Sequence, residues 1–246
     1  MMNLFIHFIY GVRQLLRQPS AKVRLLLLIP MAQILPFMLM GSAFLSRENT
    51  EWFLYTNLAW GFMSSCALQA LIWTQTVINT GRLNMILLVD GGLIGWMVGF
   101  TAGLNALYIM STCLSTILIA YILGFPVQAI LVLITLAASV PVSLGSIAFI
   151  LGCEIRWGRV LHVVNTGLDL LMILSGVLYP IMALGAVAGA LSLVFPTSHL
   201  NEFLRGGASW HILAAFGLAG VYAGIGAFWV RTSVARYRVT GLIGSR

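Results

Sequence analysis

The sequence predicts an all-α integral membrane protein that crosses the bilayer with six helices. Of its 246 residues, 60% are hydrophobic and 8% are charged, whereas an ordinary soluble domain carries about 25% charged residues. No charged residue occurs from Gly91 to Cys153, and this stretch is long enough for two spans, since each needs about 20 apolar residues. The composition therefore excludes a soluble globular domain and a disordered chain, and three cysteines are too few for a disulfide scaffold.

Polar loops and helix breakers divide the chain, residues 1–246, into the parts of one transmembrane domain. Charged loops are expected at 47–51 and 154–159, a polar turn at 79–82, and a Gly-Phe-Pro breaker at 124–126. Between them lie apolar segments of the length that a 30 Å hydrocarbon core requires. The expected spans are about 24–46, 52–78, 93–123, 126–152, 161–179 and 210–230.

The placement of basic residues supports this count. With six spans both termini lie in the cytoplasm, and among the basic residues only Arg47 and Arg205 face outward, in agreement with the positive-inside tendency. The apolar segment 181–195 lies between two prolines and is too short for a span. We therefore expect a re-entrant or outer helical segment there, a basic cytoplasmic tail at 231–246, and a location in the plasma or inner membrane.

The first residues, 1–19, are expected to form an interfacial amphipathic helix. Apolar residues recur there at helical spacing, opposite Arg13, Gln14, Arg17 and Gln18, and Pro19 ends the pattern. A secretory signal peptide would instead begin with basic residues and end at a small-residue cleavage site. A plain membrane anchor without a further role explains the same pattern.

The sequence holds no constellation typical of an enzyme. Its four histidines lack metal-ligand spacing, so we expect neither a metal nor a catalytic residue. The one lysine, Lys22, is not preceded by glycine or followed by serine or threonine, as a phosphate-binding loop requires. Any ATP must therefore be used by a partner. The cations do not cluster on a soluble domain, so nucleic acid is not an expected partner.

Polar residues inside two spans are the candidates for a translocation path. In the second span they lie close to one helical face, and in the fifth they do the same. Asp169 is the one acidic residue well inside an expected span, where a carboxylate costs about 2.5–3.5 kcal/mol on insertion scales. Hydrogen bonding between packed helices is the alternative explanation for the serines and glutamines. The candidates are Asn57, Ser64, Ser65, Gln69, Asn165, Asp169 and Met172.

Three stretches carry a resemblance to the permease subunits of the type-2 ATP-binding-cassette exporter family. Leu15–Pro19 and the proline-bearing first span resemble that family's interfacial elbow helix and entry. The segment Asn79–Val89 is similar to its cytoplasmic coupling segment. Ser175–Pro180, continued by Phe195–Arg205, resembles its span-five exit, broken outer helices and proline-rich return.

The resemblance implies a permease without a cofactor of its own, which pairs with a second permease as a homodimer or heterodimer. Each permease would dock a cytoplasmic ATPase subunit that binds ATP and Mg. Substrate would pass between the permeases along spans two and five, with 181–195 closing the outer side. The residues that the resemblance assigns to ATPase coupling are Arg17, Thr80, Gly81, Arg82, Leu83, Met85, Leu87, Arg156 and Arg159.

A self-sufficient channel or secondary carrier for a small solute is the alternative function. Many coupled carriers contain internal inverted repeats, and residues 1–123 and 124–246 show no convincing repeat. The sequence does not identify the transported substrate.

Overall fold

The computed structural model describes residues 47–82, 92–124, 127–158 and 160–240 of the chain, together with scattered shorter pieces. The pieces are residues 6, 8, 9, 12, 13, 31, 32, 34–36, 38, 39 and 86. Throughout this described part the secondary structure consists of helices and turns.

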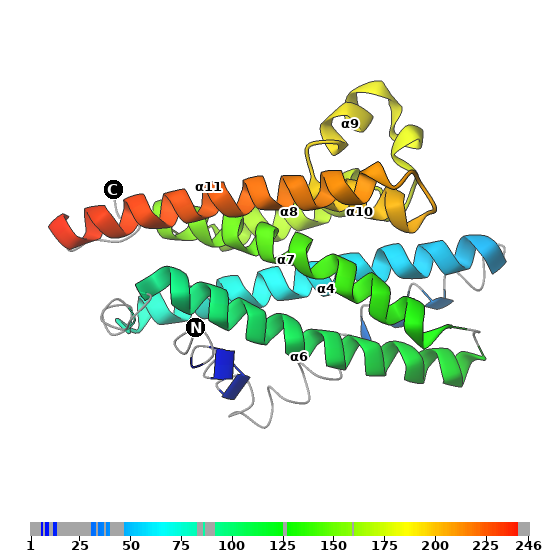
Figure 1. The fold of residues 1–246 in the computed structure, drawn as a ribbon, viewed down its shortest axis with the longest axis horizontal. Coiled ribbons are helices and arrows are strands. Elements are labelled where there is room, and N and C mark those ends of the chain that lie inside the picture. The colour runs from blue at the N-terminus through cyan, green and yellow to red at the C-terminus, as the bar shows by residue number, and fades with distance from the viewer. Residues whose placement is uncertain are drawn as a thin grey trace.

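Five longer helices lie along the long axis of the molecule, and three short helical elements lie at one end (Figure 1). Successive long helices run in opposite directions, and α7 contacts α4, α6 and α11. The long helices are α4 (Arg47–Asn79), α6 (Gly92–Leu123), α7 (Ala129–Trp157), α8 (Leu161–Leu174) and α11 (Trp210–Thr240). The short elements are η2 (Ile181–Leu184), α9 (Gly185–Ser192) and α10 (Pro196–Leu204).

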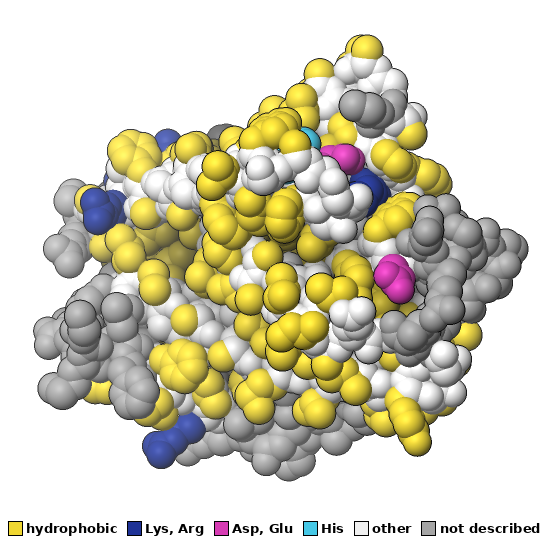
Figure 2. Space-filling model, turned by 45° about the vertical axis from the view of Figure 1, so that its right-hand side comes forward, with side chains coloured by type: hydrophobic (Ala, Val, Ile, Leu, Met, Phe, Trp, Pro, Cys, Tyr) yellow, Lys and Arg dark blue, Asp and Glu magenta, His cyan; other side chains and the backbone are white. Residues whose placement is uncertain are grey.

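Three of these helices are long and apolar enough to cross a membrane. They are Gly92–Leu123, Ala129–Trp157 and Trp210–Tyr237 within the described residues. Among the described residues, apolar side chains are spread widely over the face in Figure 2, where few charged ones appear. Leu114 and Tyr121 on α6 are 68% and 85% exposed. Exposed apolar surface of this extent suits contact with lipid rather than water. The expectation of a helical membrane protein is therefore supported.

A buried apolar core joins α4, α6 and α7. It includes Phe62 and Leu71 of α4, Phe100 and Leu104 of α6, and Leu136 of α7. Phe100 and Leu104, four residues apart, lie on one face of α6, whereas Phe62 and Leu71, nine residues apart, lie on opposite faces of α4, so α4 is enclosed on more than one side. The core fixes α4 against α6, and one polar pocket lies between these two helices and α8.

Close backbone contact joins α7 to α11. A methyl group placed on Gly152 would lie 2.8 Å from the Cα atom of Gly226, and one placed on Gly226 would clash with the backbone of Ala148. Only residues without a side chain permit this approach, as in other tightly packed membrane helices.

The prediction of a charged loop at 47–51 is wrong, because these residues form the first turns of α4. Glu51 lies near the helix N-terminus, where a carboxylate is favoured by the helix dipole. Hydropathy marks where a chain leaves the apolar core, and a helix can continue past that point.

Two other helices also continue past the ends that the sequence predicted, for the same reason. The structure extends α7 to Trp157, so Glu154 and Arg156 lie on its last turn rather than in a loop. It also extends α11 to Thr240, so the first ten residues of the expected basic tail are helical. Residues 241–246 and Arg159 lie outside the described residues.

The fifth expected span, 161–179, ends five residues early. Helix α8 has 14 residues and is about 21 Å long at 1.5 Å per residue. Ser175 begins a turn in which Gly176 has a φ of +72°, a conformation that favours glycine and commonly ends a helix. By itself α8 is thus shorter than the hydrocarbon core of a bilayer.

The segment 181–195, expected to be re-entrant or an outer helical segment, is broken into η2 and α9. In Figure 1 it stands out from the side of the bundle near one end. The proline-rich return after it forms α10, which begins with Pro196 at a position where its missing N–H costs nothing.

The interfacial helix at 1–19 and the first span at 24–46 lie mostly outside the described residues. Their described residues are helical, and Ile34 and Met38 are buried in the core. A methyl group on Gly103 would lie 3.0 Å from the carbonyl oxygen of Phe8, so the backbone at Phe8 lies close to α6.

Candidate functional site

A pocket of about 370 Å³ lies between α4, α6 and α8. Helix α4 supplies most of its wall, α8 supplies the opposite wall, and α6 contributes Tyr108. The lining residues are Asn57, Trp60, Gly61, Ser64, Ser65, Leu68, Gln69, Tyr108, Asn165, Leu168, Asp169 and Met172.

All seven residues that the sequence suggested for a translocation path line this pocket. Asn57, Ser64, Ser65 and Gln69 come from α4, and the other three come from α8. Their spacings of three, four, seven or eight residues place them on one face of each helix. The structure therefore brings the two polar faces together, which the sequence alone could not do because the helices are a hundred residues apart.

Asn57 contributes a buried hydrogen-bond acceptor to the pocket. Its side chain is 6% exposed, and its amide nitrogen donates to the carbonyl oxygen of Phe53 over 2.7 Å. Its Oδ1 atom has no hydrogen-bond partner among the described residues. An unpaired buried acceptor of this kind costs about 1–3 kcal/mol. By contrast, the Ser64 hydroxyl donates within its own helix, to the carbonyl oxygen of Gly61.

Asp169 and Asn165 lie on the open side of the pocket. Both side chains are exposed, and within the described part of the chain Asp169 has no ion pair. Leu168, between them on the helix surface, is buried against α4 and anchors α8 there. The carboxylate is thus placed at the pocket rim, accessible from outside this chain.

Five lining residues are not among the sequence candidates: Trp60, Gly61, Leu68, Tyr108 and Leu168. Trp60, Leu68 and Leu168 are apolar and carry no signal that separates a pocket wall from a core. Tyr108 belongs to α6, whose part in the pocket emerges from tertiary packing. Conversely Gln75, Thr76 and Gly176, which continue the polar faces in sequence, do not line the pocket.

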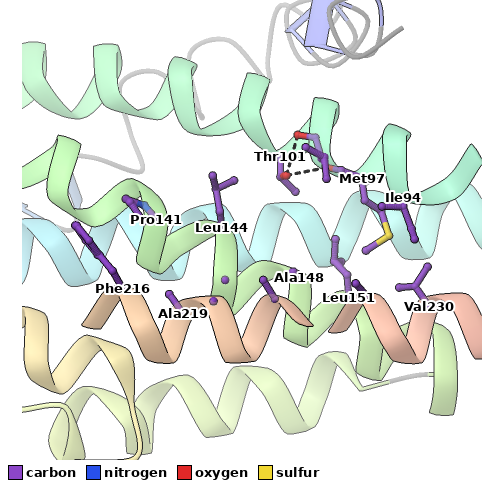
Figure 3. A pocket seen from close by; sticks show the side chains of 15 residues that line it. Ile94, Met97, Thr101, Pro141, Leu144, Ala148, Leu151, Phe216, Ala219 and Val230 are labelled. Atoms are coloured by element: carbon purple, nitrogen blue, oxygen red, sulfur yellow. Dashed lines mark hydrogen bonds between the residues drawn. The ribbon is translucent and has the colours of Figure 1, made fainter. Parts of the chain in front are cut away.

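A second pocket, of about 440 Å³, is almost wholly apolar (Figure 3). It lies between α6, α7 and α11 and includes Met97, Pro141, Leu144 and Phe216. The Thr101 hydroxyl donates back to the carbonyl oxygens of Met97 and Val98 on its own helix. No charged side chain is among the described residues that line it, so it offers a polar solute nothing to bind.

A hydrogen-bonded cluster ties α10 to the turn after α8. The Arg205 guanidinium pairs with Glu202 and donates to the carbonyl oxygens of Gly176 and Val177. Glu202 also accepts from the backbone N–H of Ile181 over 2.9 Å. Burial lowers the pKa of Arg205, and Glu202 offsets part of this effect.

The same cluster reaches α4 and contains further buried contacts. Asn201 donates to the carbonyl oxygen of Ser175, and Thr56 donates to that of Val177. The guanidinium carbon of Arg205 lies 4.5 Å from the ring centre of Trp52, within the range of a cation–π contact. This end of the bundle is therefore held by side chains from α4 and α10 that bind one turn.

His199 and His211 meet beside this cluster. Their Nδ1 atoms are 3.1 Å apart, and Nε2 of His199 lies 3.0 Å from the carbonyl oxygen of Leu193. Burial is the main cause that lowers the pKa of His199; His211 adds to this, while the Leu193 carbonyl and Glu202 act against it. No group of three metal-ligating side chains occurs among the residues that the structure describes.

The expected coupling residues lie in part at the opposite end of the bundle from α10 (Figure 1). Thr80, Gly81 and Arg82 form an exposed turn after α4. Arg156 is half-buried, 5.7 Å from the ring centre of Trp157. The candidates Arg17, Leu83, Met85, Leu87 and Arg159 lie outside the described residues.

Compared with known proteins, the sequence matches no protein-family model and no curated protein.

Proposed function

We propose that this chain is the membrane-spanning subunit of an ATP-binding-cassette exporter. Two permeases form the translocation path, and each couples to a separate cytoplasmic ATPase subunit. The observation that carries the proposal is the pocket on α4 and α8, which gathers every polar candidate of both helices and leaves Asp169 exposed at its rim.

The exposed rim is the argument for a second permease. Asp169 is the ninth residue of α8, about 12 Å from its first residue at 1.5 Å per residue. A carboxylate at such a depth in a bilayer faces a partner or a water-filled path rather than lipid. A second copy of this chain, or a related permease, would cover the open side and turn two half-sites into one polar passage.

Six spans with both termini in the cytoplasm are part of the proposal. The alternating directions of α4, α6, α7, α8 and α11 suit it, with the first span preceding α4. The turn at Arg82, the connection from α7 to α8 and the basic end of α11 then share the cytoplasmic side. The outer side carries α9 and α10, which would close the passage.

Docking of the ATPase is assigned to the cytoplasmic end. The exposed turn of Thr80, Gly81 and Arg82 offers a cation to a partner. Glu154, on the last turn of α7, accepts from the backbone N–H of Val160 at the start of α8. A movement imposed on this end of α7 would therefore reach α8 and the pocket directly.

The proposal is tested by co-expression with candidate ATP-binding-cassette ATPase subunits and purification through a tag on the permease. We expect a stable complex that hydrolyses ATP, and we expect Arg82→Glu to reduce ATPase recovery. Glu51→Arg reverses a charge of similar exposure at the other end of α4 and should leave recovery unchanged. Failure to retain any such ATPase, with transport by the lone chain, would establish the alternative, a self-sufficient channel or carrier.

A further inference from the structure

We propose that the pocket on α4 and α8 binds an organic cation, an ammonium group carried on an apolar body. The inference rests on the proposed function, which makes this pocket the place where cargo is held. It adds the chemical class of that cargo, and it follows from the charges, the hydrogen-bonding atoms and the rings that line the pocket.

The charge of the lining is negative. Asp169 contributes a carboxylate, and no lysine, arginine or histidine is among the described lining residues. In the described chain the carboxylate has no ion-pair partner, so its charge is available to a ligand. An anionic cargo would meet this carboxylate without a counter-charge, and like charges at close range cost free energy.

The buried amide of Asn57 offers the pocket an acceptor rather than a donor. The Oδ1 atom of Asn57 is buried and without a partner, while the amide nitrogen is already used by the carbonyl of Phe53. A ligand that donates an N–H would satisfy Oδ1, and hydrogen bonds from a charged donor are stronger than those from a neutral one. A protonated amine supplies both the donor and the charge.

Aromatic side chains complete the site. Trp60 and Tyr108 line the pocket from two different helices and are 7% and 3% exposed. The faces of such rings attract cations by about 0.5–2 kcal/mol, most when water is excluded. Leu68, Leu168 and Met172 supply apolar surface beside them. Together these groups match a cation with a hydrophobic body.

The apolar pocket of Figure 3 provides the contrast. It has a similar volume, but no charged side chain is among its described lining residues, and its Thr101 hydroxyl is used within α6. A variant in that pocket therefore serves as a control for general effects of substitution on the bundle.

The test measures binding to the purified full-length permease in nanodiscs of neutral lipid, with empty discs subtracted. Three probes share one phenylbutyl body: 4-phenylbutylammonium, its N-trimethyl derivative, and the anion 5-phenylpentanoate. We expect both cations to bind and the anion to bind at least tenfold more weakly. This comparison uses the unaltered protein and does not depend on how a variant folds.

Variants then separate charge from hydrogen bonding. Asp169→Asn should weaken both cations by about tenfold, which lies between the values for exposed and buried ion pairs, while Asp169→Glu should retain binding. Asn57→Leu should weaken 4-phenylbutylammonium more than the N-trimethyl cation, which has no N–H to donate. Thr101→Val in the apolar pocket should change neither affinity.

Equal affinity for the anion, or unchanged cation binding in both Asp169→Asn and Asn57→Leu, would overturn the inference. Because no ATPase subunit is present, this outcome is distinct from failure of the proposed function. If an ATPase associates with the permease but the permease binds the cations and the anion equally, the exporter proposal stands and the cation-site inference fails. If the permease binds the cations selectively but no ATPase associates with it, the cation-site inference stands and the exporter proposal fails.

Discussion

Arg205 and Glu202 form an ion pair with a nitrogen–oxygen distance of 3.1 Å, and both residues also bind backbone groups of the turn that follows α8. Arg205 donates to the carbonyls of Gly176 and Val177, and Glu202 accepts from the N–H of Ile181. The pair thus replaces the helical hydrogen bonds that end at Leu174. It ties the turn after α8 to α10 although α8 itself stops short.

Loss of the guanidinium should destabilise the bundle. Arg205→Gln removes the guanidinium donor from two carbonyls and leaves the half-buried Glu202 carboxylate with the Ile181 N–H alone. We expect a loss of about 2 kcal/mol, or roughly 4–8 °C in melting temperature. Arg231→Gln, an exposed arginine on α11, should cost less than about 0.5 kcal/mol. Thermal unfolding of the purified variants in one detergent measures both; equal melting temperatures would contradict the role given to Arg205.

Stability at the α10 end should fall in acid because of His199. Burial lowers the pKa of this histidine below its usual 6.5, so the unfolded chain binds a proton that the folded chain excludes. Stability is then full above about pH 6.5 and decreases as the pH falls below it. Between pH 7 and pH 5, the melting temperature of His199→Gln should depend less on pH than that of the unaltered protein. His162→Gln, an exposed histidine on α8, is the control, and an unchanged slope in His199→Gln would refute the assignment.

The contact between α7 and α11 should tolerate no added side chain at Gly226. A Cβ atom there would overlap the backbone of Ala148, whereas one at Gly224 would meet nothing within 4 Å. We expect Gly226→Ala to cost about 1–3 kcal/mol and Gly224→Ala to be neutral or slightly stabilising, since alanine favours a helix. Thermal melting separates the two; similar behaviour of the pair would show that the helices do not approach this closely.

The open side of the pocket should lie against a second permease in the membrane. Thr166 is exposed on α8 beside Asn165, so Thr166→Cys should form a disulfide-linked dimer under mild oxidation, in a background without Cys66, Cys113 and Cys153. Leu118→Cys, on an exposed surface of α6, should stay monomeric on denaturing gels. Cross-linking at Leu118 and not at Thr166 would place the partner on a different face.

The candidate site was predictable from sequence to the extent that polar spacing reveals a helical face. Asn57 and Ser64 repeat at the helical period in an otherwise apolar span, as do Asn165 and Asp169, and the pocket contains all four. The contribution of Tyr108 was not predictable, because nothing local indicates which residue of α6 will lie opposite α4. The unpaired Oδ1 of Asn57 likewise emerges only from packing.

The helix ends were predicted less well, for a reason that two residues make plain. Glu51 and Glu154 are charged and were assigned to loops, but both are helical. Glu154 is also 3% exposed and binds the N–H of Val160. Hydropathy reports the solvent that a residue prefers, whereas helix ends are set by turns such as Ser175–Gly176 and by the side chains that bind them.

The most direct test of the central claim is transport of 4-phenylbutylammonium in proteoliposomes that contain the permease with or without its ATPase subunit. We predict movement that requires both subunits and hydrolysable ATP, and that falls several-fold in Asp169→Asn while the ATPase remains bound. Movement by the permease alone, equal with and without ATP and unaffected by Asp169→Asn, would contradict the account.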